Sequence, residues 1–70
     1  MTAEEWIRTF AEEIGSEPPG PELMDEILRL ASVAAHASER KAAPIACWLA
    51  AGTGRPIAEL RGIAETLPAP

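Results

Sequence analysis

A chain of 70 residues is long enough for one domain with a small core, and we expect a single helical domain over residues 1–70. Its formal net charge of −5 disfavours binding to nucleic-acid phosphates, and no uninterrupted apolar run reaches membrane-spanning length. One cysteine cannot form an internal disulfide, and no basic leader with an apolar core is present, so we expect a cytoplasmic protein.

The first predicted helix covers residues 3–14. Thr2 and Glu5 have the spacing of a capping box, and Gly15 is a natural stop for the helix. Acidic side chains occupy most of one side of this segment. The apolar residues recur at helical intervals on the other side: Ala3, Trp6, Ile7, Phe10 and Ile14.

A turn-rich linker, SEPPG at residues 16–20, precedes a second predicted helix over residues 21–39. Pro21 suits the first helical position, where its missing N–H has no partner to lose. The helix is predicted to be amphipathic, with one apolar stripe made of Leu23, Ile27, Leu30, Ala34 and Ala37.

The third predicted helix, residues 44–51, has no polar side. Pro44 should begin it, because a proline disfavours helical angles in the residue before it, and Gly52 should end it. Its two faces are both apolar: Ile45, Trp48 and Leu49 on one, and Cys47, Ala50 and Ala51 on the other. Such a helix is normally surrounded by protein, so we expect it to be the central helix or to have one face in a subunit contact.

The two tryptophans are the largest apolar side chains, and we expect both to anchor the core, with packing against each other as one arrangement. Trp6 has a partner interface as an alternative, because tryptophan is enriched in such interfaces.

A fourth helix is predicted over residues 56–67, with Pro56 at its start and Gly62 weakening it by roughly 1 kcal/mol relative to alanine. No segment alternates like a strand. The sequence therefore predicts an all-α fold, a compact bundle of four short helices over about 3–14, 21–39, 44–51 and 56–67.

The local concentration of positive charge lies at Arg29, His36 and Arg40, spaced i, i+7 and i+11, with Lys41 next to them. One interpretation is a basic stripe that binds an acidic partner surface or a phosphate group. The other is purely structural: the C-terminal end of a helix favours Arg40 and Lys41, and His36 hydrogen-bonds Ser32 one turn earlier. The four residues are the candidate binding residues of this sequence.

Nothing in the sequence predicts catalysis. His36 and Cys47 cannot complete a metal-ligand set, and we predict neither a metal site nor a cofactor. Cys47 is interpreted as a small apolar filler rather than a nucleophile, because no group is placed to activate it. We therefore expect a protein that is not an enzyme.

Two stretches resemble a small domain of unknown function found in actinobacteria: EEWI at residues 4–7 and AHASERKAAPIACWLAAGTG at residues 35–54. That domain occurs alone or fused behind a nucleotidyltransferase-like domain of the molybdenum cofactor guanylyltransferase type. The resemblance covers residues 4–67 and implies a helical accessory or docking domain in molybdenum cofactor handling. It includes His36, Glu39, Arg40 and Pro44 but implies no catalytic role for them.

Three functions follow as hypotheses. The first is a non-enzymatic interaction domain that binds a protein partner, with a molybdenum cofactor biosynthesis protein as the candidate that the resemblance implies. The second is binding of a phosphorylated small ligand through Arg29, His36, Arg40 and Lys41. The third is a structural homodimer joined through the back of the helix at residues 44–51.

Overall fold

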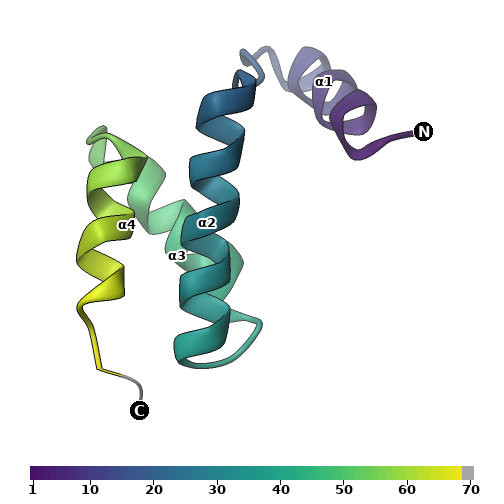
Figure 1. Ribbon diagram of the computed structural model, residues 1–70. Coiled ribbons are helices and arrows are strands. Elements are labelled where there is room, and N and C mark those ends of the chain that lie inside the picture. The colour runs from purple at the N-terminus through teal and green to yellow at the C-terminus, as the bar shows by residue number, and fades with distance from the viewer. Residues whose placement is uncertain (69–70) are drawn as a thin grey trace.

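The computed structural model describes residues 1–68 and contains four helices (Figure 1). Their bounds are α1 Ala3–Ile14, α2 Pro21–Ala37, α3 Ala42–Thr53 and α4 Ile57–Glu65. No strand occurs in the described part of the chain. The predicted all-α fold of four short helices is confirmed.

Both ends of α1 are set by the residues that the sequence singled out. The Glu5 N–H donates to the Thr2 hydroxyl at 3.1 Å, and the Thr2 N–H donates to the Glu5 carboxylate at 3.0 Å. These two bonds form the predicted capping box. Gly15 follows the helix with φ of 71°, a left-handed angle that costs glycine little, and its N–H bonds the carbonyls of Ala11 and Glu12.

α2 begins at Pro21 as predicted but ends at Ala37, two residues before the predicted boundary at 39. Ser38 is the cause. Its hydroxyl donates to the Ala34 carbonyl at 3.1 Å, and its N–H donates to the same carbonyl at 3.2 Å. The N–H bond is an ordinary helical bond, but the hydroxyl bond to the same carbonyl weakens the last turn, and φ of −141° at Ser38 lies outside the helical region.

The predicted bounds of the third and fourth helices are wrong by one or two residues. α3 begins at Ala42, so Pro44 lies in its first turn, where a missing N–H breaks no helical bond. It continues through Gly52 and ends before Gly54, whose φ is 71°. α4 starts after Pro56 and ends at Glu65 rather than at 67.

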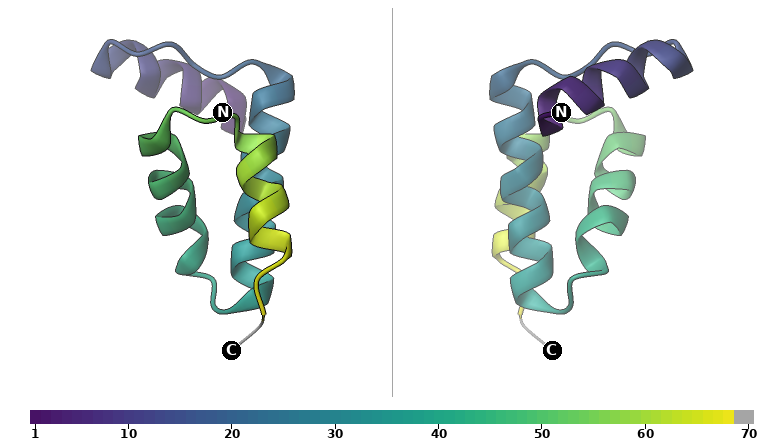
Figure 2. Two further views of the ribbon diagram at one scale, coloured as in Figure 1. Left: turned by 90° about the vertical axis from the view of Figure 1, so that its left-hand side faces the viewer. Right: turned by 90° about the vertical axis from the view of Figure 1, so that its right-hand side faces the viewer.

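The central helix is α2, which packs along both α3 and α4. The prediction that the segment around residues 44–51 is central is therefore wrong. α3 and α4 approach each other far less closely, and the side views in Figure 2 show α3 standing apart from α4. Leu30 of α2 and Ala50 of α3 are the buried residues of this three-helix unit.

One ion pair joins α4 to α2. The Arg61 Nε atom lies 2.8 Å from the Glu26 carboxylate, and both side chains are about three-quarters covered. Arg61 also pairs with Glu65 on its own helix.

α1 packs against none of the other helices within residues 1–68. Figure 1 shows it beyond the N-terminal end of α2, on the side away from α4. Trp6 and Phe10 stack on each other with ring centroids 5.2 Å apart, yet Trp6 is 57% exposed. The prediction that Trp6 anchors the core is therefore wrong, because its helix has no core to face.

Leu30→Ala should destabilise the domain by about 2–5 kcal/mol, because Leu30 is only 4% exposed and its loss leaves a cavity between three helices. Leu28→Ala is the matched control on the same helix, at a side chain that is 62% exposed. Urea unfolding followed by circular dichroism measures both. Equal losses of stability in the two variants would contradict the assignment of the core.

The Glu26–Arg61 pair should make stability depend on pH. The hydrogen bond from Arg61 lowers the pKa of the Glu26 carboxyl below its ordinary value. The stabilisation is therefore complete above about pH 4.3, the pKa of an unfolded-state glutamate, and is lost as pH falls through the lower folded value. Urea midpoints of wild type and Glu26→Gln should differ at pH 7 and converge toward pH 3. The exposed Glu13→Gln is the control, and the same convergence there would show that the ion pair is not the cause.

Candidate functional site

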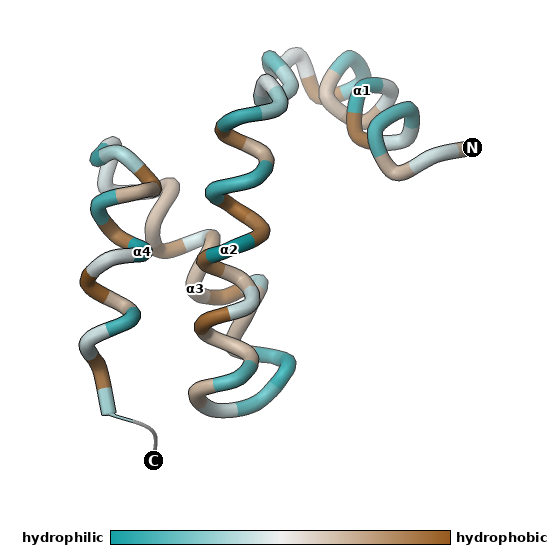
Figure 3. Tube along the Cα trace, viewed as in Figure 1, coloured by the Kyte–Doolittle hydropathy of each residue, from teal (hydrophilic) through white to brown (hydrophobic). Residues whose placement is uncertain are grey.

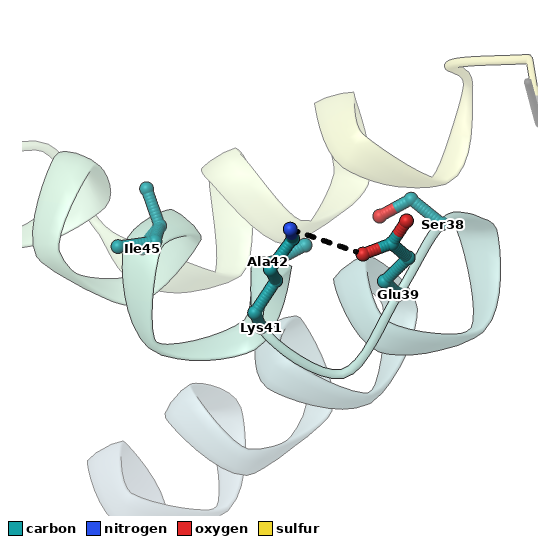
Figure 4. A pocket seen from close by; sticks show the side chains of 5 residues that line it. All are labelled: Ser38, Glu39, Lys41, Ala42 and Ile45. Atoms are coloured by element: carbon teal, nitrogen blue, oxygen red, sulfur yellow. Dashed lines mark ion pairs between the residues drawn. The ribbon is translucent and has the colours of Figure 1, made fainter.

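The basic residues predicted to form a stripe are exposed, and two of them already have acidic partners. Arg29 Nε lies 3.0 Å from the Asp25 carboxylate one turn earlier on α2. Lys41 Nζ lies 3.4 Å from the Glu39 carboxylate (Figure 4). Ser32 Oγ and His36 Nδ1 are 3.2 Å apart, which is the hydrogen bond expected from the structural interpretation.

These four residues do not converge on one concave surface. α2 ends at Ala37, so Arg40 and Lys41 lie in the turn before α3 rather than in line with Arg29. An open hollow at this turn is lined by Lys41, Ser38, Glu39, Ala42 and Ile45. It includes neither Arg29, His36 nor Arg40, and the Glu39 carboxylate beside Lys41 opposes an anionic ligand (Figure 4).

Cys47 is held as a structural residue. Its Sγ atom lies 3.8 Å from the Ile27 carbonyl of α2, and its side chain is half-buried between the helices. Burial raises the pKa of the thiol. A thiol in this setting is a poor nucleophile at neutral pH, in keeping with the interpretation as an apolar filler.

A strip of apolar side chains lies on the outer side of α3. Ile45 is 60% exposed and Trp48 is 76% exposed, so the prediction that Trp48 lies in the core is wrong. The reason is the size of the residues on the opposite side. Ala46 and Ala50 line the packed side of the helix beside Leu30, and small side chains there allow the two helices to come close.

A pattern in the sequence could have identified the packed face. Ala42, Ala46 and Ala50 recur at intervals of four, which places three small residues on one side of the helix. All three are buried or half-buried in the structure. Figure 3 shows that α3 has none of the strongly hydrophilic colour that marks the preceding turn, so hydropathy alone could not distinguish its faces.

The divergence of α3 and α4 leaves an apolar groove with Leu30 of α2 at its base. Leu49 lies along its α3 side, and Ile63 and Leu67 lie along its α4 side. The volume of this part is about 250 Å³, and an adjoining hollow of about 260 Å³ shares Leu30 and Leu67. No charged residue lines either part.

Residues 1–68 contain no group of three or more His, Cys, Asp or Glu side chains that could hold a metal ion. None of the helices in that range is both long enough and apolar enough to cross a membrane.

The fold and its surface define a small all-α domain with an open apolar groove and an exposed apolar strip. The profile described as Domain of unknown function (DUF6457) matches residues 1–68, so the chain belongs to this family. No curated protein and no solved structure matches the chain. The predicted resemblance to a small domain of unknown function is confirmed at this level.

Cys47 should react slowly with a thiol reagent such as dithionitrobenzoate at pH 7.5, at no more than about a tenth of the rate of the unfolded chain. Partial burial and a raised pKa both reduce the concentration of accessible thiolate. Absorbance at the thionitrobenzoate band gives the rate, with the urea-unfolded protein as the reference. A folded protein that reacts as fast as the unfolded chain would show an activated cysteine.

Proposed function

We propose that this domain is a non-enzymatic interaction module that binds a protein partner through Ile45 and Trp48, which we call the outer strip of α3. The observation that carries the proposal is the exposure of 76% of a tryptophan on a helix without charged residues. Tryptophan is strongly enriched among residues that dominate binding energy, and leaving one in water is unfavourable unless a partner covers it.

The surroundings of the outer strip favour a protein over a small ligand. The hollow beside it is lined by Trp48, Leu49, Ala51, Gly52 and Thr53, which offer no charged group to orient a polar metabolite. A flat apolar strip with few polar groups matches the core of a protein interface. Small-molecule sites are instead usually concave, with a few convergent polar groups.

The proposed partner class is a molybdenum cofactor biosynthesis protein. Its support is the sequence resemblance, which implies a fusion to a guanylyltransferase-type domain. A domain that is elsewhere covalently joined to such an enzyme is a reasonable candidate to bind it without covalent linkage. The phosphorylated-ligand hypothesis has less support, because Arg29 and Lys41 are paired with carboxylates.

Trp48→Ala should weaken binding to the purified guanylyltransferase, or to a sulfurtransferase-type maturation protein, by about 2 kcal/mol, or roughly thirtyfold. Removing the large exposed ring deletes the central contact of the outer strip but leaves the helix packing intact. Isothermal titration calorimetry measures the affinities, with circular dichroism to verify folding.

Trp6→Ala is the matched control, because it removes an exposed tryptophan that lies on a different helix. It should bind as wild type does. An equal loss in both variants would argue against the outer strip, and absence of binding to either protein at micromolar concentration would argue against this partner class.

A further inference from the structure

The chain exposes more surface than a folded monomer of its size. Its accessible surface is 5412 Å², whereas a globular protein of 7.4 kDa exposes roughly 4,200 Å². The radius of gyration is 12.8 Å, against about 11 Å for a domain of 70 residues. The excess surface of about 1,200 Å² is more than the roughly 800 Å² that each partner buries in a standard interface.

α1 contributes to this exposed surface, because it packs against no other helix in residues 1–68. Trp6, Phe10 and Ile14 follow each other at intervals of four, so they form one stripe along the helix. All three are exposed, and the Trp6–Phe10 stack gives the stripe a rigid aromatic surface. Ala11 is the buried residue of this helix. An amphipathic helix of this kind is stabilised mainly by packing of its apolar face, and here that face is uncovered.

The groove between α3 and α4 is the matching vacant surface. Leu49, Ile63 and Leu67 line it and remain 45–63% exposed, above the buried Leu30. Two diverging helices over a third present a hydrophobic groove, which is the usual docking place for the apolar face of a further helix.

The charges of the two surfaces do not oppose this docking. α1 carries four glutamates and one arginine. No charged residue lines the groove, so its lining has no carboxylate that would repel these glutamates.

The α1 of the same chain does not occupy the groove. Figures 1 and 2 place α1 past the N-terminal end of α2, on the side away from α4. Pro18 and Pro19 stiffen the linker between the two helices, because each has a fixed φ. The available α1 is therefore that of a second copy.

We infer that two copies of this chain form a symmetric dimer by exchanging α1, so that the Trp6–Phe10–Ile14 stripe of each copy lies in the α3–α4 groove of the other. Exchange is reciprocal, so the interface is closed and no further copies add. The outer strip, Ile45 and Trp48, stays free in this dimer. The inference is thus independent of the proposed function.

The test is the mass of the full chain by light scattering from 1 to 200 µM. Wild type should have twice the 7.4 kDa of the single chain. Phe10→Glu in the stripe and Ile63→Glu in the groove should each raise the dimer Kd at least about thirtyfold. Both side chains are exposed in the single chain, so the helical fold should persist, as circular dichroism will verify. Trp48→Glu is the control and should remain a dimer.

Mixing the two disrupted variants supplies a sharper test. A mixture of Phe10→Glu and Ile63→Glu retains one intact stripe and one intact groove per pair, so it should recover dimer that neither variant forms alone. A second readout is the fluorescence of Trp6 in Trp48→Phe, which should shift to shorter wavelength as concentration rises.

Three results would overturn the inference. The first is a wild-type protein that stays monomeric at 200 µM, including one whose Trp6 emission is already blue-shifted because α1 folds into its own groove. The second is a dimer that survives both glutamate substitutions. The third is a dimer abolished by Trp48→Glu, which would place the contact on the outer strip instead.

Discussion

The close packing of α3 on α2 through small side chains determines the rest of this structure. Leu30 of α2 is buried beside Ala46 and Ala50 of α3, and Cys47 touches the backbone of α2 at the Ile27 carbonyl. Alanines allow a short distance between helices but bury little area themselves. With the small residues on the packed side, Ile45, Trp48 and Leu49 must project elsewhere. Because α3 packs on α2 through its alanine face, its large apolar side chains form the exposed strip and one side of the groove.

The position of α4 depends on a second contact of different chemistry. Arg61 of α4 forms an ion pair with Glu26 of α2. Leu60 and Ala64, also on α4, are half-buried. α4 is thereby held to α2 rather than to α3, and the groove between α3 and α4 remains open. A domain of this size has little stability in reserve, so even a contact worth about 1 kcal/mol matters to the position of α4.

Local signals in the sequence predicted the helices well, because capping and left-handed glycine angles depend on a few neighbouring residues. Thr2, Glu5 and Gly15 set the bounds of α1 as expected. The predicted end of α2 was wrong because the backbone leaves helical angles at Ser38, whose hydroxyl bonds the Ala34 carbonyl; a serine can occupy either a helix or its end, so its identity alone did not mark the boundary. The larger error was at Trp48. Hydrophobicity alone cannot say which side of an all-apolar helix faces inward. The prediction rested on the size of Trp48, and in the structure this side chain is exposed. Likewise, the alignment of Arg29 with Arg40 required a helix that continues to residue 40.

The first helix shows why the surface and the stability of this domain have to be considered together. An isolated helix of 12 residues is marginal in water even with good caps, because nucleation is costly. α1 has its capping box, but its apolar stripe gains nothing from the other helices of its own chain. Whatever covers the Trp6–Phe10–Ile14 stripe therefore stabilises α1 as it binds, and by mass action the stability of the domain rises with the concentration of that partner. The exposed apolar stripe of α1 is unfavourable in a single chain, and its burial is what would favour association with another.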